Sequence, residues 1–271
     1  MRRKSDIKII DFILIQVISF LIVLTFNYKY IGILMNLSIY DDRNKVFIIC
    51  TQVISIIILL LYLGISIDDI KKSYIDFKEK LDIKEIIGRY INSIMLSLGV
   101  TLLLISIAML TYKPYENSLL TSSGDPIYTG NIIIMIVSVA IIGPILEEII
   151  FRKVLFISIS KKYNYKIGIL ISSILFGIGH SIDKSILASL FGGVLCILYI
   201  KYENILIPIF LHIINNSMSI VLKLPQESKI NKNIDMTTST IHMYLILGLV
   251  ITTLSVYYYI RFINLNKKYI K

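Results

Sequence analysis

Two adjacent carboxylates and an arginine interrupt an apolar run in the stretch Gly143-Pro144-Ile145-Leu146-Glu147-Glu148-Ile149-Ile150-Phe151-Arg152-Lys153. A charge near the middle of a membrane helix costs roughly 2.5 to 3.5 kcal/mol on insertion scales, so such groups usually face a protein interior or a water-filled cavity. On a helix, Glu148 and Arg152 lie on one face and can pair, whereas Glu147 points about 100° away. The spacing predicts a buried ion pair beside a carboxylate that is free for another task.

The composition is that of a polytopic membrane protein. Of the 271 residues, 56% are hydrophobic, and the mean hydropathy is +0.77, outside the range of soluble domains. The formal net charge of +10 sits in short clusters between apolar runs. Such clusters indicate membrane topology and argue against a nucleic-acid partner. Cys50 and Cys196 lie in apolar segments without metal-ligand spacing, so we expect buried structural thiols.

Eight apolar segments approach the roughly 20 residues that a membrane-spanning helix needs. Their limits are Ile9–Phe26, Val46–Ile67, Ile91–Leu110, Ile132–Ser160, Ile167–Ile182, Ile186–Ile200, Ile205–Leu222 and Ile241–Ile260. Between the second and third, Asp68–Arg89 reads as one amphipathic helix on the cytoplasmic surface. We therefore expect an all-α transmembrane helical bundle of about eight membrane helices. It would form a single integral membrane domain over residues 1–271, with a motif-bearing core at about 131–222.

The basic residues predict the orientation of the bundle, because Lys and Arg concentrate in cytoplasmic loops. With a cytoplasmic N-terminus, 18 of the 28 Lys and Arg fall on the inner side and 8 on the outer side. Arg2, Arg3 and Lys4 precede the first apolar segment, which lacks a cleavage site, so we expect that segment to be retained. The sequence predicts a multi-pass protein of the cell membrane with both termini in the cytoplasm.

Polar residues of three later spans line up in depth. The fifth span contains His180, and the seventh contains His212 and Asn216 on one helix face. At 1.5 Å per residue, Glu147 and His180 each lie about 21 Å from the predicted inner boundary, His212 about 16 Å and Asn216 about 22 Å. We expect these side chains to converge on one wet site. Asn215 is expected to serve packing or hydrogen bonding.

This set of residues suits hydrolysis of an amide. A carboxylate and an imidazole that face one water can activate it as a nucleophile, and Glu147 and His180 fit those roles. An imidazole N–H and an Asn amide can stabilise the oxyanion, and His212 and Asn216 fit there. Glu147, His180 and His212 are also a zinc-ligand set with an open fourth position. An HExxH pair is absent, so the preferred interpretation requires no cofactor and zinc is the alternative.

The ordered motifs resemble a known family. Glu147-Glu148-x-x-x-Arg152, Phe176-x-x-x-His180 and His212-x-x-x-Asn216 are similar to the three signatures of the CPBP (CAAX protease and bacteriocin-processing, also called Abi) family of intramembrane endopeptidases. The resemblance covers roughly Ile132–Ser219. It implies that Glu147 and His180 activate water, that His212 and Asn216 form an oxyanion hole, and that Glu148 and Arg152 support the site. The family carries a metalloprotease label, and its members often have Gly where this chain has Lys153.

The resemblance also implies a substrate class. Eukaryotic members cleave prenylated CAAX tails, whereas bacterial members are associated with bacteriocin maturation, self-immunity or protein anchoring. The Ile, Lys and Asn bias suggests an AT-rich bacterial genome, so we expect a membrane-associated or lipidated peptide or protein substrate. Two other functions stay open: a non-catalytic membrane binding or immunity protein, and a proton or cation transporter with Glu147, Glu148 and the histidines as a relay. The lack of inverted repeats argues against the transporter.

Overall fold

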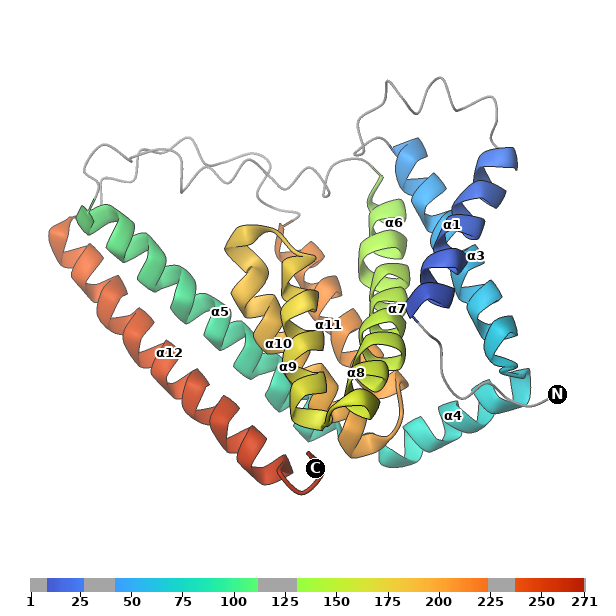
Figure 1. The fold of residues 1–271 in the computed structure, drawn as a ribbon. Coiled ribbons are helices and arrows are strands. Elements are labelled where there is room, and N and C mark those ends of the chain that lie inside the picture. Colours follow the sequence, from blue (N-terminus) through green and yellow to red (C-terminus); the bar gives the residue numbers. More distant parts are fainter. Residues whose placement is uncertain (1–8, 27–41, 112–130, 224–236, 271) are drawn as a thin grey trace. The chain divides into compact units, whose positions relative to one another are not determined.

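The structure is a computed structural model that describes residues 9–26, 42–111, 131–223 and 237–270. The regular elements in these ranges are all helices, which confirms the predicted all-α class (Figure 1). The predicted N-terminal basic cluster at Arg2, Arg3 and Lys4 falls outside these ranges. The described helices group into two compact units, whereas a single domain over residues 1–271 stays a prediction.

Five helices in the described ranges are long and apolar enough to cross a membrane. They lie at Val46–Leu63, Ile83–Thr111, Ile132–Lys162, Lys184–Tyr202 and Thr238–Asn266. Three shorter apolar helices lie at Ile10–Val23, Tyr165–Ile178 and Leu206–Leu222. Together they correspond to the eight predicted segments, so the chain is a multi-pass membrane protein; the number of crossings and the orientation of the termini stay predictions.

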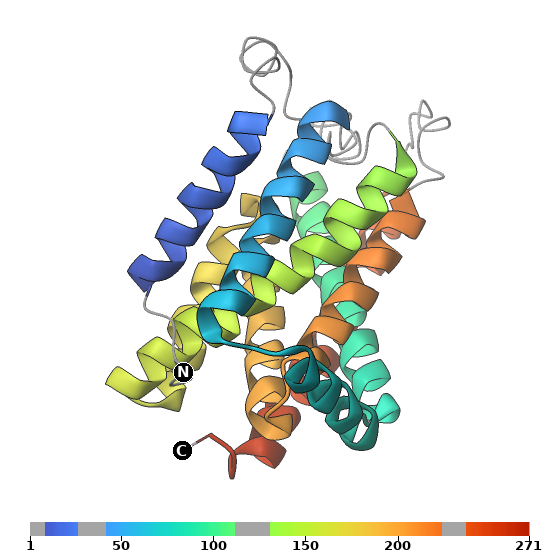
Figure 2. The same cartoon turned by 90° about the vertical axis from the view of Figure 1, so that its right-hand side faces the viewer.

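The larger unit contains the motif-bearing helices. It begins with α1 (Ile9–Phe26), α3 (Asp42–Leu63) and α4 (Ile67–Lys80), and it continues with α9 (Tyr165–Ile178), α10 (Ile182–Tyr202) and α11 (Leu206–Lys223). Helices α1 and α3 lie side by side in both views (Figures 1 and 2). Phe12, Ile15 and Leu59 from this pair pack with Leu146 and Val154 of the predicted fourth span. This apolar contact holds the carboxylate-bearing helix against α1 and α3.

The predicted fourth span is one long helix in which two π-helical stretches interrupt the α-helical winding. It consists of α6 (Ile132–Met135), the π-helical η3 (Ile136–Ile142), α7 (Gly143–Glu148), the π-helical η4 (Ile149–Phe156) and α8 (Ile157–Lys162). In the π-helical stretches, each backbone N–H donates to the carbonyl five residues back instead of four. This geometry is rare in proteins overall, and where it occurs it is often at a functional site. The motif Glu147-Glu148 therefore stands at the end of a short α-helical segment between two widened turns.

Helix α4 confirms part of the predicted amphipathic segment. Ser66 and Asp69 form a capping box at its start. However, the expected single helix over Asp68–Arg89 is wrong, because the helix ends at Lys80 and a new one begins at Ile83. The Asp82 carboxylate accepts a hydrogen bond from the Glu85 N–H, which favours a helix start there.

One asparagine fastens α4 to the turn between α10 and α11. Asn204 Nδ2 donates to the Ser73 carbonyl and to Asp76 Oδ2, both at 2.8 Å, and its Oδ1 accepts from the Leu206 N–H. Lys80 Nζ lies 2.8 Å from Asp76 Oδ1 and donates to the Tyr202 carbonyl. The hydrogen bonds from Lys80 and Asn204 lower the pKa of Asp76 below its ordinary value. Helix α4 is thereby tied to the turn that precedes α11, the helix that carries His212.

The second unit pairs α5 (Ile83–Thr111) with α12 (Thr238–Asn266). A Cβ built on Gly99 would lie 2.8 Å from the backbone nitrogen of Thr252, and one on Gly248 would lie 3.0 Å from that of Leu103. The two contacts run in opposite order along the two helices, so the pair is antiparallel. Small residues allow the backbones to approach this closely, as is common between membrane helices.

Two further expectations need correction. The predicted fifth span ends at Ile178 instead of Ile182, so His180 lies in the turn between α9 and α10 and not within a helix. Gly179 follows the last helical residue and its N–H still bonds to the Leu175 carbonyl. Cys196 is buried as expected, but Cys50 is exposed on α3, because it lies on the face of that helix that no described helix covers.

Candidate active site

The predicted pair of Glu148 and Arg152 is present and fully buried. Arg152 Nε lies 2.9 Å from Glu148 Oε2, an ion pair at hydrogen-bond distance although the N–H is not aimed at the oxygen, and neither side chain is exposed. Arg152 Nη2 also donates to the Gly192 carbonyl at 3.3 Å, and the guanidinium lies over the Phe176 ring. The arginine thus joins the carboxylate helix to α9 and α10.

Glu148 also orients His212, a contact that the sequence did not predict. His212 Nδ1 lies 2.9 Å from Glu148 Oε1, and the imidazole is 2% exposed. A carboxylate that faces a guanidinium acts as an acceptor, so His212 donates its Nδ1–H. Phe176 and Phe191 hold the ring at its edges, with centroids 5.5 and 5.7 Å away. The other ring nitrogen, Nε2, is therefore aimed at the remaining carboxylate.

That carboxylate belongs to Glu147, which is the more open of the two. Its side chain is 37% exposed, and its Oε2 lies 3.8 Å from His212 Nε2, too far for a hydrogen bond. Oε2 is buried and has no hydrogen-bond partner among the described residues. Glu147 is thus available for a small ligand such as water, in agreement with the prediction that it stays out of the ion pair.

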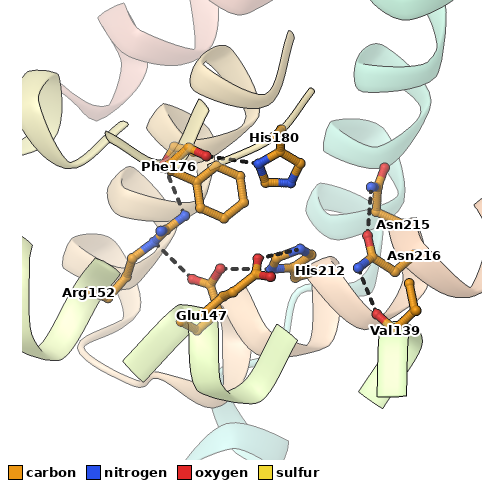
Figure 3. Close-up of polar contacts among 10 residues, drawn as sticks. Val139, Glu147, Arg152, Phe176, His180, His212, Asn215 and Asn216 are labelled. Atoms are coloured by element: carbon orange, nitrogen blue, oxygen red, sulfur yellow. Dashed lines mark hydrogen bonds and ion pairs between the residues drawn. The ribbon is translucent and has the colours of Figure 1, made fainter. Parts of the chain in front are cut away.

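His180 approaches from the turn after α9. Its Nδ1 lies 2.8 Å from the Phe176 carbonyl oxygen, which can only accept, so Nδ1 carries a proton and donates it; in the neutral ring Nε2 is then the acceptor. The Phe176 ring lies 4.8 Å from the His180 ring and 5.5 Å from the His212 ring. Figure 3 shows Glu147, His180 and His212 in the same part of the molecule. In the described part of the chain, no residue forms a hydrogen bond with His180 Nε2.

Asn216 lies one helical turn beyond His212 and makes different contacts. Its Nδ2 donates to the Val139 carbonyl at 2.9 Å, and its Oδ1 accepts from Asn215 Nδ2 at 3.3 Å (Figure 3). Asn215 is therefore a hydrogen-bonding residue, as expected. The structure brings Glu147, Glu148, Arg152 and His212 into direct contact, whereas His180 joins them through Phe176 and Asn216 stands beside the group.

The described side chains do not form a ready-made metal site. Within the described ranges, no three His, Cys, Asp or Glu side chains are grouped closely enough to hold a metal ion. Both imidazoles have Nδ1 engaged and leave Nε2 without a hydrogen bond to a described residue, a pattern that zinc-binding histidines also show, so the zinc alternative stays a prediction.

Backbone carbonyls are the part of the site that motif analysis missed. The carbonyls of Phe176, Gly192 and Val139 accept from His180, Arg152 and Asn216, respectively. Any residue type presents a carbonyl, so only a helix-packing prediction could have found them. Lys153 places its Nζ over the Tyr199 ring, 5.4 Å from the centroid.

The fold and site define a multi-pass helical membrane protein with a buried Glu, His and Arg network, a class to which intramembrane peptidases belong. Residues 129–218 match the model of the family described as Type II CAAX prenyl endopeptidase Rce1-like, and the match confirms the resemblance seen in the motifs. The match covers the segment that carries the three motifs, about a third of the chain.

Two curated proteins are similar to this segment. The "Putative membrane peptidase YdiL" of Bacillus subtilis (strain 168) is 40% identical over 92 residues, which are 34% of this chain and 38% of that protein. The "Membrane-embedded CAAX protease MroQ" of Staphylococcus aureus (strain USA300) is 29% identical over 120 residues, 41% of this chain and 48% of that protein. The chain thus spans less than half the length of either relative. No solved structure matches.

Proposed function

We propose that the protein is an intramembrane endopeptidase that hydrolyses a peptide bond of a membrane-associated or lipidated peptide or protein. The observation that carries the proposal is Glu147 Oε2, which has no hydrogen-bond partner among the described residues and lies 3.8 Å from His212 Nε2, together with two imidazoles whose Nδ1 atoms are engaged. This arrangement leaves one carboxylate and two Nε2 atoms for a water and a carbonyl. The family match and the two peptidase-like relatives support the same reaction class.

In this proposal Glu147 and His180 activate the nucleophile. His180 donates Nδ1–H to the Phe176 carbonyl, so its Nε2 can accept a hydrogen bond from water. Glu147 takes the proton as the water oxygen attacks the carbonyl carbon, and it later delivers that proton to the leaving amine. Such general acid–base catalysis typically contributes about 10²- to 10⁴-fold to the rate.

His212 and Asn216 then receive the negative charge of the tetrahedral intermediate. Because His212 gives Nδ1–H to Glu148, only the imidazolium can also donate Nε2–H to an oxyanion. Glu148 and Arg152 serve as orienting groups, because both are buried and out of a ligand's reach. No step of this scheme uses a metal ion.

The proposed substrate class is the kind of peptide that an enzyme embedded in a membrane encounters. We propose a lipid-anchored or membrane-inserted peptide, with bacteriocin processing or self-immunity as the cellular role, because bacterial members of the resembled family are associated with both. Prenylated substrates suit the AT-rich bacterial bias of the sequence poorly.

The test is activity of the purified protein in liposomes on a library of lipidated, internally quenched peptides. Glu147→Gln and His180→Ala should each lower kcat by about 10²- to 10⁴-fold. Membrane insertion and the thermal unfolding midpoint should stay near those of the unmodified protein, because Glu147 and His180 are not in the buried pair. Full activity in either variant would overturn the proposal, as would Glu147-dependent ion flux without cleavage.

A further inference from the structure

The Gly143-Pro144 pair leaves one carbonyl of the carboxylate helix without a backbone donor. In a regular α-helix the Val139 carbonyl would accept from the Gly143 N–H, and in a π-helix from residue 144. Here the Gly143 N–H donates to the Ser138 carbonyl instead. Residue 144 is Pro144, which has no N–H. Both usual donors to the Val139 carbonyl are thereby removed.

Asn216 of α11 takes up the carbonyl that has been set free. Its Nδ2 donates to the Val139 oxygen at 2.9 Å. A carbonyl oxygen only accepts, so this contact requires the nitrogen, and not the oxygen, of the amide to face η3. Asn215 Nδ2 approaches the Asn216 Oδ1 at 3.3 Å and favours the same orientation. One N–H of the amide is used in this way, and the second remains for a ligand oxygen.

The glycine has its own part in this arrangement. A Cβ on Gly143 would lie 2.9 Å from the Ser138 carbonyl oxygen, closer than real Cβ atoms come. Any larger residue at position 143 would clash with the Ser138 carbonyl oxygen, so the π-helical hydrogen bond to that oxygen would be lost. Gly143 and Pro144 therefore act on the same turn. The missing Cβ of Gly143 permits its N–H to bond to the Ser138 carbonyl, and the missing N–H of Pro144 leaves the Val139 carbonyl without a backbone donor.

We propose that Pro144, with Gly143, is a positioning residue that fixes the donor orientation of the Asn216 amide. The inference rests on the proposed function, in which Asn216 donates to the oxyanion. An N–H at position 144 competes for the Val139 carbonyl, releases the Asn216 amide and lets it rotate. The loss appears in the transition state, where the oxyanion forms, so it lowers kcat and leaves KM nearly unchanged.

The test is a double-mutant cycle in liposomes with a lipidated quenched peptide that the unmodified protein cleaves. Asn216→Ala should lower kcat by about 10²- to 10³-fold, the usual effect of removing one oxyanion donor. Pro144→Ala should lower kcat by about tenfold or more, with KM within about twofold, and should add less than about twofold in the Asn216→Ala background. Pro208→Ala, which restores an N–H near the start of α11, is the matched control and should stay within about twofold.

A second variant and a second measurement keep the inference testable by itself. Gly143→Ala should repeat the pattern of Pro144→Ala, and it replaces that variant if the latter fails to insert. The Asn216 side-chain amide signals of 15N-Asn-labelled protein, identified by their loss in Asn216→Ala, should shift in Pro144→Ala and not in Pro208→Ala. Unchanged amide signals, or fully additive losses of kcat, overturn the inference. If Glu147→Gln is inactive while Pro144→Ala is fully active, only the inference fails; if Glu147→Gln is fully active, the proposed function fails and the amide signals still decide the inference.

Discussion

Replacing Arg152 by methionine would remove the cation that faces Glu148 at a site where neither side chain is exposed. Breaking a buried ion pair on one side costs about 3–5 kcal/mol, mainly because the remaining charge loses its partner. Glu148 would keep the Nδ1–H of His212. We therefore expect Arg152→Met to lower the free energy of unfolding by about 3 kcal/mol, at the lower end of that range. Lys166→Met, at an exposed cation of α9, should change it by less than about 0.5 kcal/mol.

The reciprocal variant makes the test specific for the pair. Glu148→Gln leaves the Arg152 guanidinium with the Gly192 carbonyl as its hydrogen-bond acceptor, so its cost should be similar. The double variant Arg152→Met/Glu148→Gln buries no unpaired charge and should cost less than the sum of the two single variants by about 0.5–3 kcal/mol. Denaturant unfolding of the purified protein in one detergent, followed by circular dichroism, measures all four. Additive costs, or a loss below about 1 kcal/mol in Arg152→Met, would refute the reasoning.

Three other variants or treatments test separate parts of the molecule. Gly99→Ala should destabilise the α5–α12 pair by about 1–3 kcal/mol, because the new Cβ meets the Thr252 backbone, whereas Gly88→Ala, with open space around it, should be neutral or stabilising in the same unfolding assay. The pKa of Asp76 lies below its ordinary value of 3.8, so its carboxylate stabilises α4 above that pH and the contribution disappears as pH falls through the lowered pKa. Asp76→Asn should accordingly speed amide hydrogen exchange in α4 at pH 7 and make little difference well below pH 3.8; equal exchange at pH 7 would count against this role. Metal removal by chelators, verified by elemental analysis, should leave peptidase activity within about twofold, and restoration of a lost activity by zinc alone would contradict the metal-free scheme.

Sequence patterns predict this protein where the bilayer restricts the chain. Apolar runs located the membrane helices closely, because every lipid-facing residue must be apolar and every backbone polar group must bond within its helix. The Glu148–Arg152 pair followed from helical spacing alone. Amphipathic periodicity did not reveal the helix break at Leu81, because the apolar stripe continues past it while the cap at Asp82 is a local, polar feature.

The membership of the site stays a prediction from the sequence, whereas most contacts between its residues were not predicted. The order of the motifs identified Glu147, His180, His212 and Asn216, but equal depth along ideal helices could not say which side chains touch. His212 contacts both carboxylates. His180 lies in a turn, and its ring is held by the Phe176 carbonyl of α9. The π-helical turns around Glu147 and Glu148 also change the register, and apolar sequence gives no sign of them because i→i+5 bonds need no particular side chain.

The position of His180 outside any helix separates two kinds of change in the protein. Glu147 and His212 lie within helices, so a shift of either side chain requires a helix to rotate or slide. The connection from Gly179 to Ser181 can alter its length or composition while α9 and α10 keep their packing. Substitutions or insertions in this short connection are therefore the least disruptive way to move the His180 imidazole. Such changes could fit the site to peptides of different size and leave the contacts among Glu147, Glu148, Arg152 and His212 intact.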